Sequence, residues 1–323
     1  MKRTGLVVTF FIVLFALAGC GLPAPKNPPK KIAGIIFNDD QFFRLVTLGM
    51  RNGATARGYE LLEANTNSKP DREIQLINTY ISGGVEGIII SPLSLTASRT
   101  ALQLAKEKGI VVVTYNTTVE GDIPVAYVES NQEELGETTG REVRRFVEER
   151  FNGKAAIGIL AFQIQAPEQS NARVAGFKRA LDGAPGIRVV AEQDAWLAEM
   201  AIKKASDILT AHPDINILWA ANEGGTVGSA MAVKNAGKAG RVFVFGTDAS
   251  QQLADFLLAD DDILQAVTGQ RPYAMGETAV EMMDKALRGE QVTKRLSLAG
   301  RLISRSSPDS VRAFRQELQK LAR

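Results

Sequence analysis

The sequence predicts an α/β protein with two doubly wound lobes, each built on a parallel sheet. Short runs rich in Val and Ile are almost continuously apolar, which is typical of strands buried on both faces. Stretches with amphipathic helical spacing separate these runs, and the alternation of strand and helix indicates βαβ units. The runs are too numerous for one ordinary sheet, so we expect the 323-residue chain to form two sheets.

The elements follow one another in a regular order after residue 30. We expect strands at 31–37, 59–65, 86–92, 109–116, 155–162, 187–194, 216–222, 242–248 and 263–270. Helical patterns fill the intervals between them. The segment 71–84 (DREIQLINTYISGG), for example, ends on two glycines, which commonly terminate a helix.

The first 19 residues resemble a secretion signal. A basic start (MKR) precedes an apolar run that is short for a membrane span and ends in small residues. Leu17-Ala18-Gly19-Cys20 resembles the bacterial lipobox, whose cysteine receives a lipid and becomes the mature N-terminus. A plain signal peptide with an incidental cysteine is the alternative. Residues 20–30 carry four prolines and predict an extended tether, so we expect a lipid-anchored protein at the cell surface or in the periplasm.

Composition narrows the class of partner. The net charge is +2, and basic and acidic residues are well mixed, so nucleic acid is not an expected partner. The chain contains one histidine, His212, and one cysteine, Cys20. We therefore expect no metal site, no cofactor and no intramolecular disulfide.

Polar residues at the ends of the predicted strands indicate a binding site, because ligands of such sheets bind at the carboxyl ends of the strands. The candidates at strand ends are Asp40, Ser91, Asn116, Asn222, Asp248 and Gln270, and neighbouring loops add Arg173 and Trp196. Carboxylates accept hydrogen bonds, arginine donates them, and amides do both. This set suits a neutral polyhydroxylated ligand.

Two adjacent aromatic residues, Phe42 and Phe43, follow the first strand. Neighbouring residues on a helix point about 100° apart, so one core face cannot easily take both rings. One such ring alone would more often be a core residue. Beside three polar residues at a strand end, we expect the pair to form one wall of a ligand cleft, with Trp196 opposite. Trp219 we expect in the core.

Short motifs in a fixed order resemble the type I periplasmic sugar-binding proteins of bacterial ABC importers, and most closely their ribose-binding branch. The resemblance covers about residues 31–300 and rests on the aromatic pair, NARVAGFKRAL, ILTAHPD, ILWAANEGGTVG, VFGTDAS and VTGQRPYAMG. It implies that Arg173, Asn222, Asp248 and Gln270 bind the ligand. The chain departs from the branch at Asn116-Thr117, where that branch carries Asp-Arg, and at Asp40, Gln41 and Trp196. We therefore expect the cleft of that family but not ribose itself.

The resemblance also implies the architecture and the function. Lobe one would comprise 31–131 and 271–296, lobe two 132–270 and 297–323, and three hinge strands would join them. The protein would be a monomeric, non-enzymatic, extracytoplasmic binding protein that delivers a monosaccharide or polyol to ABC permease subunits. Three alternatives stay open: a sensor component that presents its ligand to a membrane receptor or quorum signalling system, a secreted glycoside-active enzyme, and a sugar-responsive regulator. The last class begins with a helix-turn-helix, where this chain carries a signal-like segment.

Overall fold

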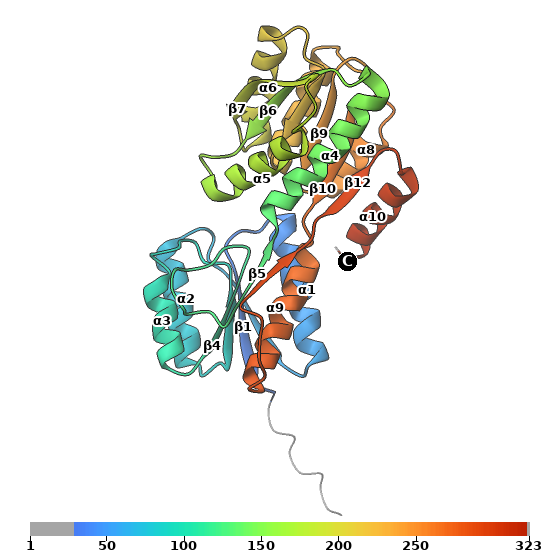
Figure 1. Cartoon of the computed structure of the whole chain (residues 1–323). Coiled ribbons are helices and arrows are strands. Elements are labelled where there is room, and N and C mark those ends of the chain that lie inside the picture. Colours follow the sequence, from blue (N-terminus) through green and yellow to red (C-terminus); the bar gives the residue numbers. More distant parts are fainter. Residues whose placement is uncertain (1–28, 322–323) are drawn as a thin grey trace, which may run out of the picture.

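A computed structural model describes residues 29–321, so Cys20 and the predicted signal and tether up to residue 28 lie outside the described part. Within it, two α/β units lie one above the other, and three chain segments cross between them (Figure 1). The expected fold class, two doubly wound lobes with a hinge between them, is confirmed.

The first lobe is built on a parallel sheet with the strand order β11-β5-β4-β3-β1-β2. Its strands are β1 (Lys31–Ile36), β2 (Glu60–Asn65), β3 (Gly87–Ile90), β4 (Val111–Tyr115), β5 (Ala126–Ser130) and β11 (Arg295–Leu298). Its helices are α1 (Gln41–Ala56), α2 (Pro70–Ser82), α3 (Arg99–Glu107) and α9 (Pro272–Leu287). Two apolar clusters, one with α1 and α9 and one with α2 and α3, form its core.

The second lobe repeats this plan with the order β12-β10-β9-β8-β6-β7, in which only β12 runs antiparallel to its neighbour. Its strands are β6 (Ala155–Ala161), β7 (Ile187–Asp194), β8 (Ile217–Ala220), β9 (Phe243–Thr247), β10 (Leu264–Gly269) and β12 (Arg301–Ser304). Its helices are α4 (Gln132–Phe151), α5 (Pro167–Ala180), α6 (Ala198–Ala211), α7 (Glu223–Asn235), α8 (Gln251–Leu258) and α10 (Pro308–Leu321). Two apolar clusters again form the core.

The three crossings fall where β5 leads into α4, where β10 leads into α9, and where β11 leads into β12. Both sheets contain the strand order 2-1-3-4-5 of a doubly wound fold. The carboxyl ends of their strands, where such folds bind ligands, are therefore the places to look for a site.

Close packing of α4 against α5 fixes the relation between one crossing and the second lobe. A Cβ on Gly136 would overlap the carbonyl oxygen of Arg173, and a Cβ on Gly176 would overlap that of Glu133. Only glycine allows the two helix backbones to approach so closely. This approach brings Arg173, on α5, next to Gln132, the first residue of α4.

Candidate functional site

The loop after β1 shows where the adjacent residues Phe42 and Phe43 lie. Asp40 is the N-cap of α1: its Oδ1 accepts from the Phe43 amide at 3.0 Å and its Oδ2 from Asn38 Nδ2 at 2.9 Å. Phe43 is only 4% exposed and packs against Phe37, with ring centroids 4.4 Å apart. Phe42 is half-buried and meets Phe43 edge to face. The two rings therefore differ in burial: Phe43 lies largely in the core, and Phe42 is the more accessible ring. That the pair contacts a ligand stays a prediction.

Asn116 and Ser91 of the first lobe lie together in an uncharged network. Asn116, directly after β4, has a left-handed backbone with φ of 59°, which is uncommon outside glycine. Its Nδ2 donates to Ser91 Oγ at 3.3 Å, and Ser91 Oγ lies 2.9 Å from Thr117 Oγ1. We call Ser91, Asn116 and Thr117 the neutral network; it contains two hydroxyl groups and one amide, and Ser91 is buried.

Arg173 of the second lobe is almost completely buried, with 3% of its side chain exposed. Its Nη1 donates to the carbonyl oxygen of Ala221 at 2.8 Å and to Asp248 Oδ2 at 3.2 Å, and its Nε donates to Gln132 Oε1 at 2.8 Å. The guanidinium also lies over the Phe162 ring, 5.2 Å from its centroid. A buried charge held by this many partners is fixed in position, which is what a binding site needs from a charged donor.

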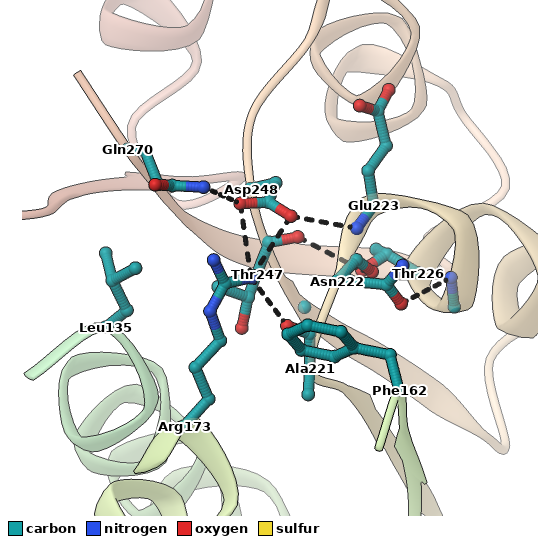
Figure 2. A network of polar contacts seen from close by, with 12 residues as sticks. Leu135, Phe162, Arg173, Ala221, Asn222, Glu223, Thr226, Thr247, Asp248 and Gln270 are labelled. Atoms are coloured by element: carbon teal, nitrogen blue, oxygen red, sulfur yellow. Dashed lines mark hydrogen bonds and ion pairs between the residues drawn. The ribbon is translucent and has the colours of Figure 1, made fainter. Parts of the chain in front are cut away.

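Asp248 lies at the centre of the charged contacts (Figure 2). It follows β9 and, like Asn116, has a left-handed backbone, with φ of 70°. Its Oδ1 accepts from Gln270 Nε2 at 2.9 Å, and its Oδ2 accepts from the Glu223 amide at 3.2 Å. Gln270 in turn accepts from Ser130 Oγ at 2.9 Å.

These bonds tie the binding candidates to the hinge. We call Gln132, Arg173, Asp248, Gln270 and Ser130 the charged network, because each is hydrogen-bonded to the next. Its two ends lie two residues apart where β5 leads into α4, so the network closes on a hinge crossing.

Asn222 and Trp196 are also brought together. Asn222 caps α7, accepting from the Gly225 amide at 3.0 Å, and donates from Nδ2 to the Trp196 carbonyl oxygen at 2.8 Å. A Cβ on Gly224 would overlap that same carbonyl oxygen. Trp196 is half-buried, whereas Trp219 is fully buried and stacked on Phe177, as predicted for a core residue.

Sequence reasoning did not single out Glu223, Gln132, Ser130 or Phe162. Burial raises the pKa of the Glu223 carboxyl, and the charges of Asp248 and Asp40 raise it further, while a hydrogen bond with Ser250 lowers it. Asp40 belongs to the first lobe, so the Glu223 carboxyl lies near the opposite wall of the cleft. Figure 2 shows its side chain extending away from Arg173. The position of Glu223 beside Asn222, at the end of a predicted strand, could have marked it as a candidate. Nothing in the local sequence marks Gln132, because its partner Arg173 is far away in the chain.

A cavity of about 750 Å³ lies between the lobes. Asn116 and Tyr127 line it from the first lobe, and Gln132 and Gln169 from the second. The lobes touch there, because Gln169 Nε2 lies 3.5 Å from the Asn116 carbonyl oxygen. Asn116 and Thr117 of the neutral network and Ser130 and Gln132 of the charged network line this cavity, so we refer to the two networks as the walls of the cleft between the lobes.

Neither a metal site nor a membrane-spanning helix is found among residues 29–321. In that range no three His, Cys, Asp or Glu side chains gather closely enough to hold a metal ion. The helices in the same range are all too short or too polar to cross a membrane.

Comparisons with known proteins agree with this fold. The profile of the family described as periplasmic binding protein domain matches residues 35–291. The ABC transporter periplasmic-binding protein YphF of Escherichia coli is 26% identical, with 87% of this chain and 89% of that protein covered. The ribose import binding protein RbsB of Bacillus subtilis is 24% identical, with 92% and 96% covered. A solute-binding protein of Actinobacillus succinogenes, solved with bound D-allose, has a TM-score of 0.78 at 22% identity, with 87% and 99% covered; at that identity it supports the fold alone.

Proposed function

The chain belongs to the periplasmic binding protein domain family, and from that premise we propose that it captures a monosaccharide or a related polyol between its lobes for an ABC import permease. The family consists of extracytoplasmic solute-binding proteins of ABC importers and not of enzymes, so the expectation of a binding protein is confirmed. The identity of the solute is the part that we propose.

The observation that carries this proposal is the charged network at the interlobe cleft. Arg173 presents a buried donor, Asp248 presents an acceptor, and Gln270 presents an amide, all held by neighbouring side chains. Adjacent sugar hydroxyls each donate one hydrogen bond and accept others, so this alternation of donors and acceptors matches them. The name of one relative, the ribose import binding protein RbsB of Bacillus subtilis, points to the same ligand class.

The wider site follows from this reading. We propose that Asp40, Phe42, Phe43, Ser91, Asn116, Arg173, Trp196, Asn222, Asp248 and Gln270 contact the ligand. We also propose the predicted division into lobe one (31–131 and 271–296) and lobe two (132–270 and 297–323), whose last boundary falls within β11 of the first sheet.

A ligand screen tests the proposed function. The purified domain is heated with and without each member of a panel of pentoses, hexoses and polyols. A ligand that binds only the folded state raises the melting temperature. At 100 times its Kd, such a ligand stabilises the folded state by about 2.7 kcal/mol. We expect at least one sugar or polyol to do so. If amino acids or peptides shift the melting temperature and no sugar does, the proposed ligand class is wrong.

We further propose that Cys20 carries a lipid that anchors a monomeric protein to a membrane. The support is the lipobox-like Leu17-Ala18-Gly19-Cys20 behind an apolar segment. Replacing Cys20 with Ser should move the protein from the membrane fraction to the soluble fraction. A membrane fraction that is unchanged by Cys20→Ser, with residues 1–19 still attached by mass spectrometry, would contradict the anchor.

A further inference from the structure

The interlobe cavity lies mostly beside the charged network and not inside it. Its lining includes Asn116, Thr117 and Tyr127 of the first lobe, and Gln165 and Gln169 of the second. Arg173, Asp248 and Gln270 do not contribute to this lining. A sugar ring seated on the charged network would therefore leave much of this space unfilled.

The cavity and the charged network share a wall that is one side chain thick. Gln132 lines the cavity and accepts from Arg173 Nε at 2.8 Å. Ser130 lines it and donates to Gln270 at 2.9 Å. A ligand held by Arg173 and Gln270 thus lies next to the cavity, and a substituent on that ligand could enter it beside Asn116.

The lining of the cavity is chemically suited to a second, uncharged ring. Thr117, Gln165 and Gln169 supply hydroxyl and amide groups, and Tyr127 supplies an aromatic ring. Of the three carboxylates in the lining, Glu129 is bonded to Arg295 through two nitrogens, Glu133 is paired with Arg179, and Glu168 is exposed to solvent. A volume of about 750 Å³ falls within the ordinary range of roughly 300–1,000 Å³ for a pocket that encloses a drug-sized ligand, which is larger than a single sugar ring.

We propose that this cavity is a second subsite and that the natural ligand is an uncharged glycoside, with one sugar ring on the charged network and a second ring in the cavity. The inference rests on the proposed function and extends its ligand from a single sugar ring to a glycoside with two rings. Asn116 and Thr117, which line the cavity, are both uncharged, and this fits a neutral substituent.

Calorimetry on matched pairs of ligands tests the proposal. The probes are D-glucose, D-galactose, D-allose and D-ribose, each beside its methyl and phenyl glycosides in both anomers, and beside cellobiose, maltose, lactose and melibiose. We expect one phenyl glycoside or disaccharide to bind at least tenfold more tightly than its parent monosaccharide. The methyl glycoside of the same sugar should show little of this gain, because it does not reach across the cavity.

Two variants on α5 assign the gain to the cavity. Gln169→Trp should fill the space and reduce the tenfold gain to less than about twofold. Asn171→Trp is the matched control: it lies on the same helix but about 200° away, is exposed, and does not line the cavity, so the gain should persist. Gln169→Ala introduces no larger side chain and is therefore less disruptive to folding than Gln169→Trp. It should remove one polar contact and reduce the gain in affinity by a smaller factor.

The outcomes separate this inference from the proposed function. If a free monosaccharide binds and every glycoside of it binds more weakly, the second subsite is wrong while the proposed function stands. A gain that survives Gln169→Trp unchanged would also overturn the subsite. If no sugar, no polyol and no glycoside binds, both proposals fail.

Discussion

The two walls of the cleft are built on equivalent strands but carry different chemistry. Asn116 follows β4 in the first lobe and Asp248 follows β9 in the second, and each is the fourth strand of its doubly wound set. Both residues have left-handed backbones. Asn116 lies among hydroxyl groups, whereas Asp248 is bonded to a buried arginine and closes a network on the hinge.

This difference indicates that the two lobes contribute unequally to the affinity for a ligand. Hydrogen bonds with an ionised partner are roughly twice as strong as those between neutral groups. The second lobe therefore supplies the stronger attachment, and we expect a ligand to dock there before the lobes close. The first lobe adds neutral hydrogen bonds and the aromatic rings of the loop after β1, which select among ligands that already fit the charged network.

The largest expected effect is the loss of affinity when the charged wall is changed. Asp248→Asn keeps a residue that tolerates the left-handed backbone but removes the charge, and Arg173→Ala removes its partner. Losing one member of a buried charged pair costs about 2–5 kcal/mol, which is tens to thousands of fold in affinity. Calorimetry with the best ligand of the screen measures it.

The matched change on the neutral wall is Asn116→Gly, which preserves the left-handed backbone and removes the amide. A neutral hydrogen bond contributes about 0.5–1.5 kcal/mol, so we expect a loss of about two- to twelvefold. Circular dichroism is the control that tests whether each variant is folded. An Asn116→Gly loss as large as that of Asp248→Asn would break the distinction between the two walls.

The next effect concerns the connection between the charged wall and the hinge. Gln132→Ala removes the acceptor that holds Arg173 Nε, and we expect affinity to fall about tenfold, or 1.4 kcal/mol. Gln132→Glu keeps an acceptor oxygen and should restore most of the affinity. If Gln132→Ala and Gln132→Glu lose the same amount, Gln132 supports the fold and does not position Arg173.

The fold was largely predictable because its signals are local. Runs such as GIII and VVVTY read as buried strands, and β3 and β4 fall within the predicted 86–92 and 109–116. The short strands of the C-terminal crossing were harder, because RLSL and RLIS are only four residues long and each carries two polar residues, so neither reads as a buried apolar run. Their pairing with β5 and β10 depends on residues far away in sequence.

The site was only partly predictable for the same reason. Strand-end positions pointed to Asp248 and Asn222, and both lie where those strands end. The partners that hold them are side chains of other elements: Gln132 meets Arg173 across 41 positions, and Ser130 meets Gln270 across 140. The exposure of Phe43 was also not readable from sequence, because it depends on how Phe37 and Tyr115 pack around it.

A smaller effect on affinity, but a clear optical one, is expected at the edge of the second lobe. Trp196 is half-buried and Trp219 is fully buried, so ligand-induced closure should change the emission of Trp196 and leave that of Trp219 nearly constant. Trp196→Phe should lose most of the fluorescence change and, because a ring remains, less than about threefold in affinity, or ~0.7 kcal/mol. A full fluorescence change in Trp196→Phe would place Trp196 away from the ligand.

The smallest expected effect is on stability and depends on pH through Glu223. Its pKa lies above the ordinary value of 4.5 in the folded protein, mainly through burial and secondarily through Asp248 and Asp40. Near and below pH 4 the carboxyl is protonated in both folded and unfolded chains and contributes no difference. As pH rises past 4.5 the unfolded chain loses this proton first, so the free energy of unfolding falls until the folded carboxyl also ionises.

Glu223→Gln removes this loss of stability, so the variant should melt at a higher temperature than the wild type at pH 7 and at nearly the same temperature at pH 4. Thermal melts across this range measure the difference. Asp40→Asn is the matched change on the opposite wall: it keeps an N-cap for α1 but removes the charge facing Glu223, and should give a smaller gain in the same direction. An Asp40→Asn gain larger than that of Glu223→Gln would show that the first lobe, and not the second, carries the unfavourable charge of the cleft.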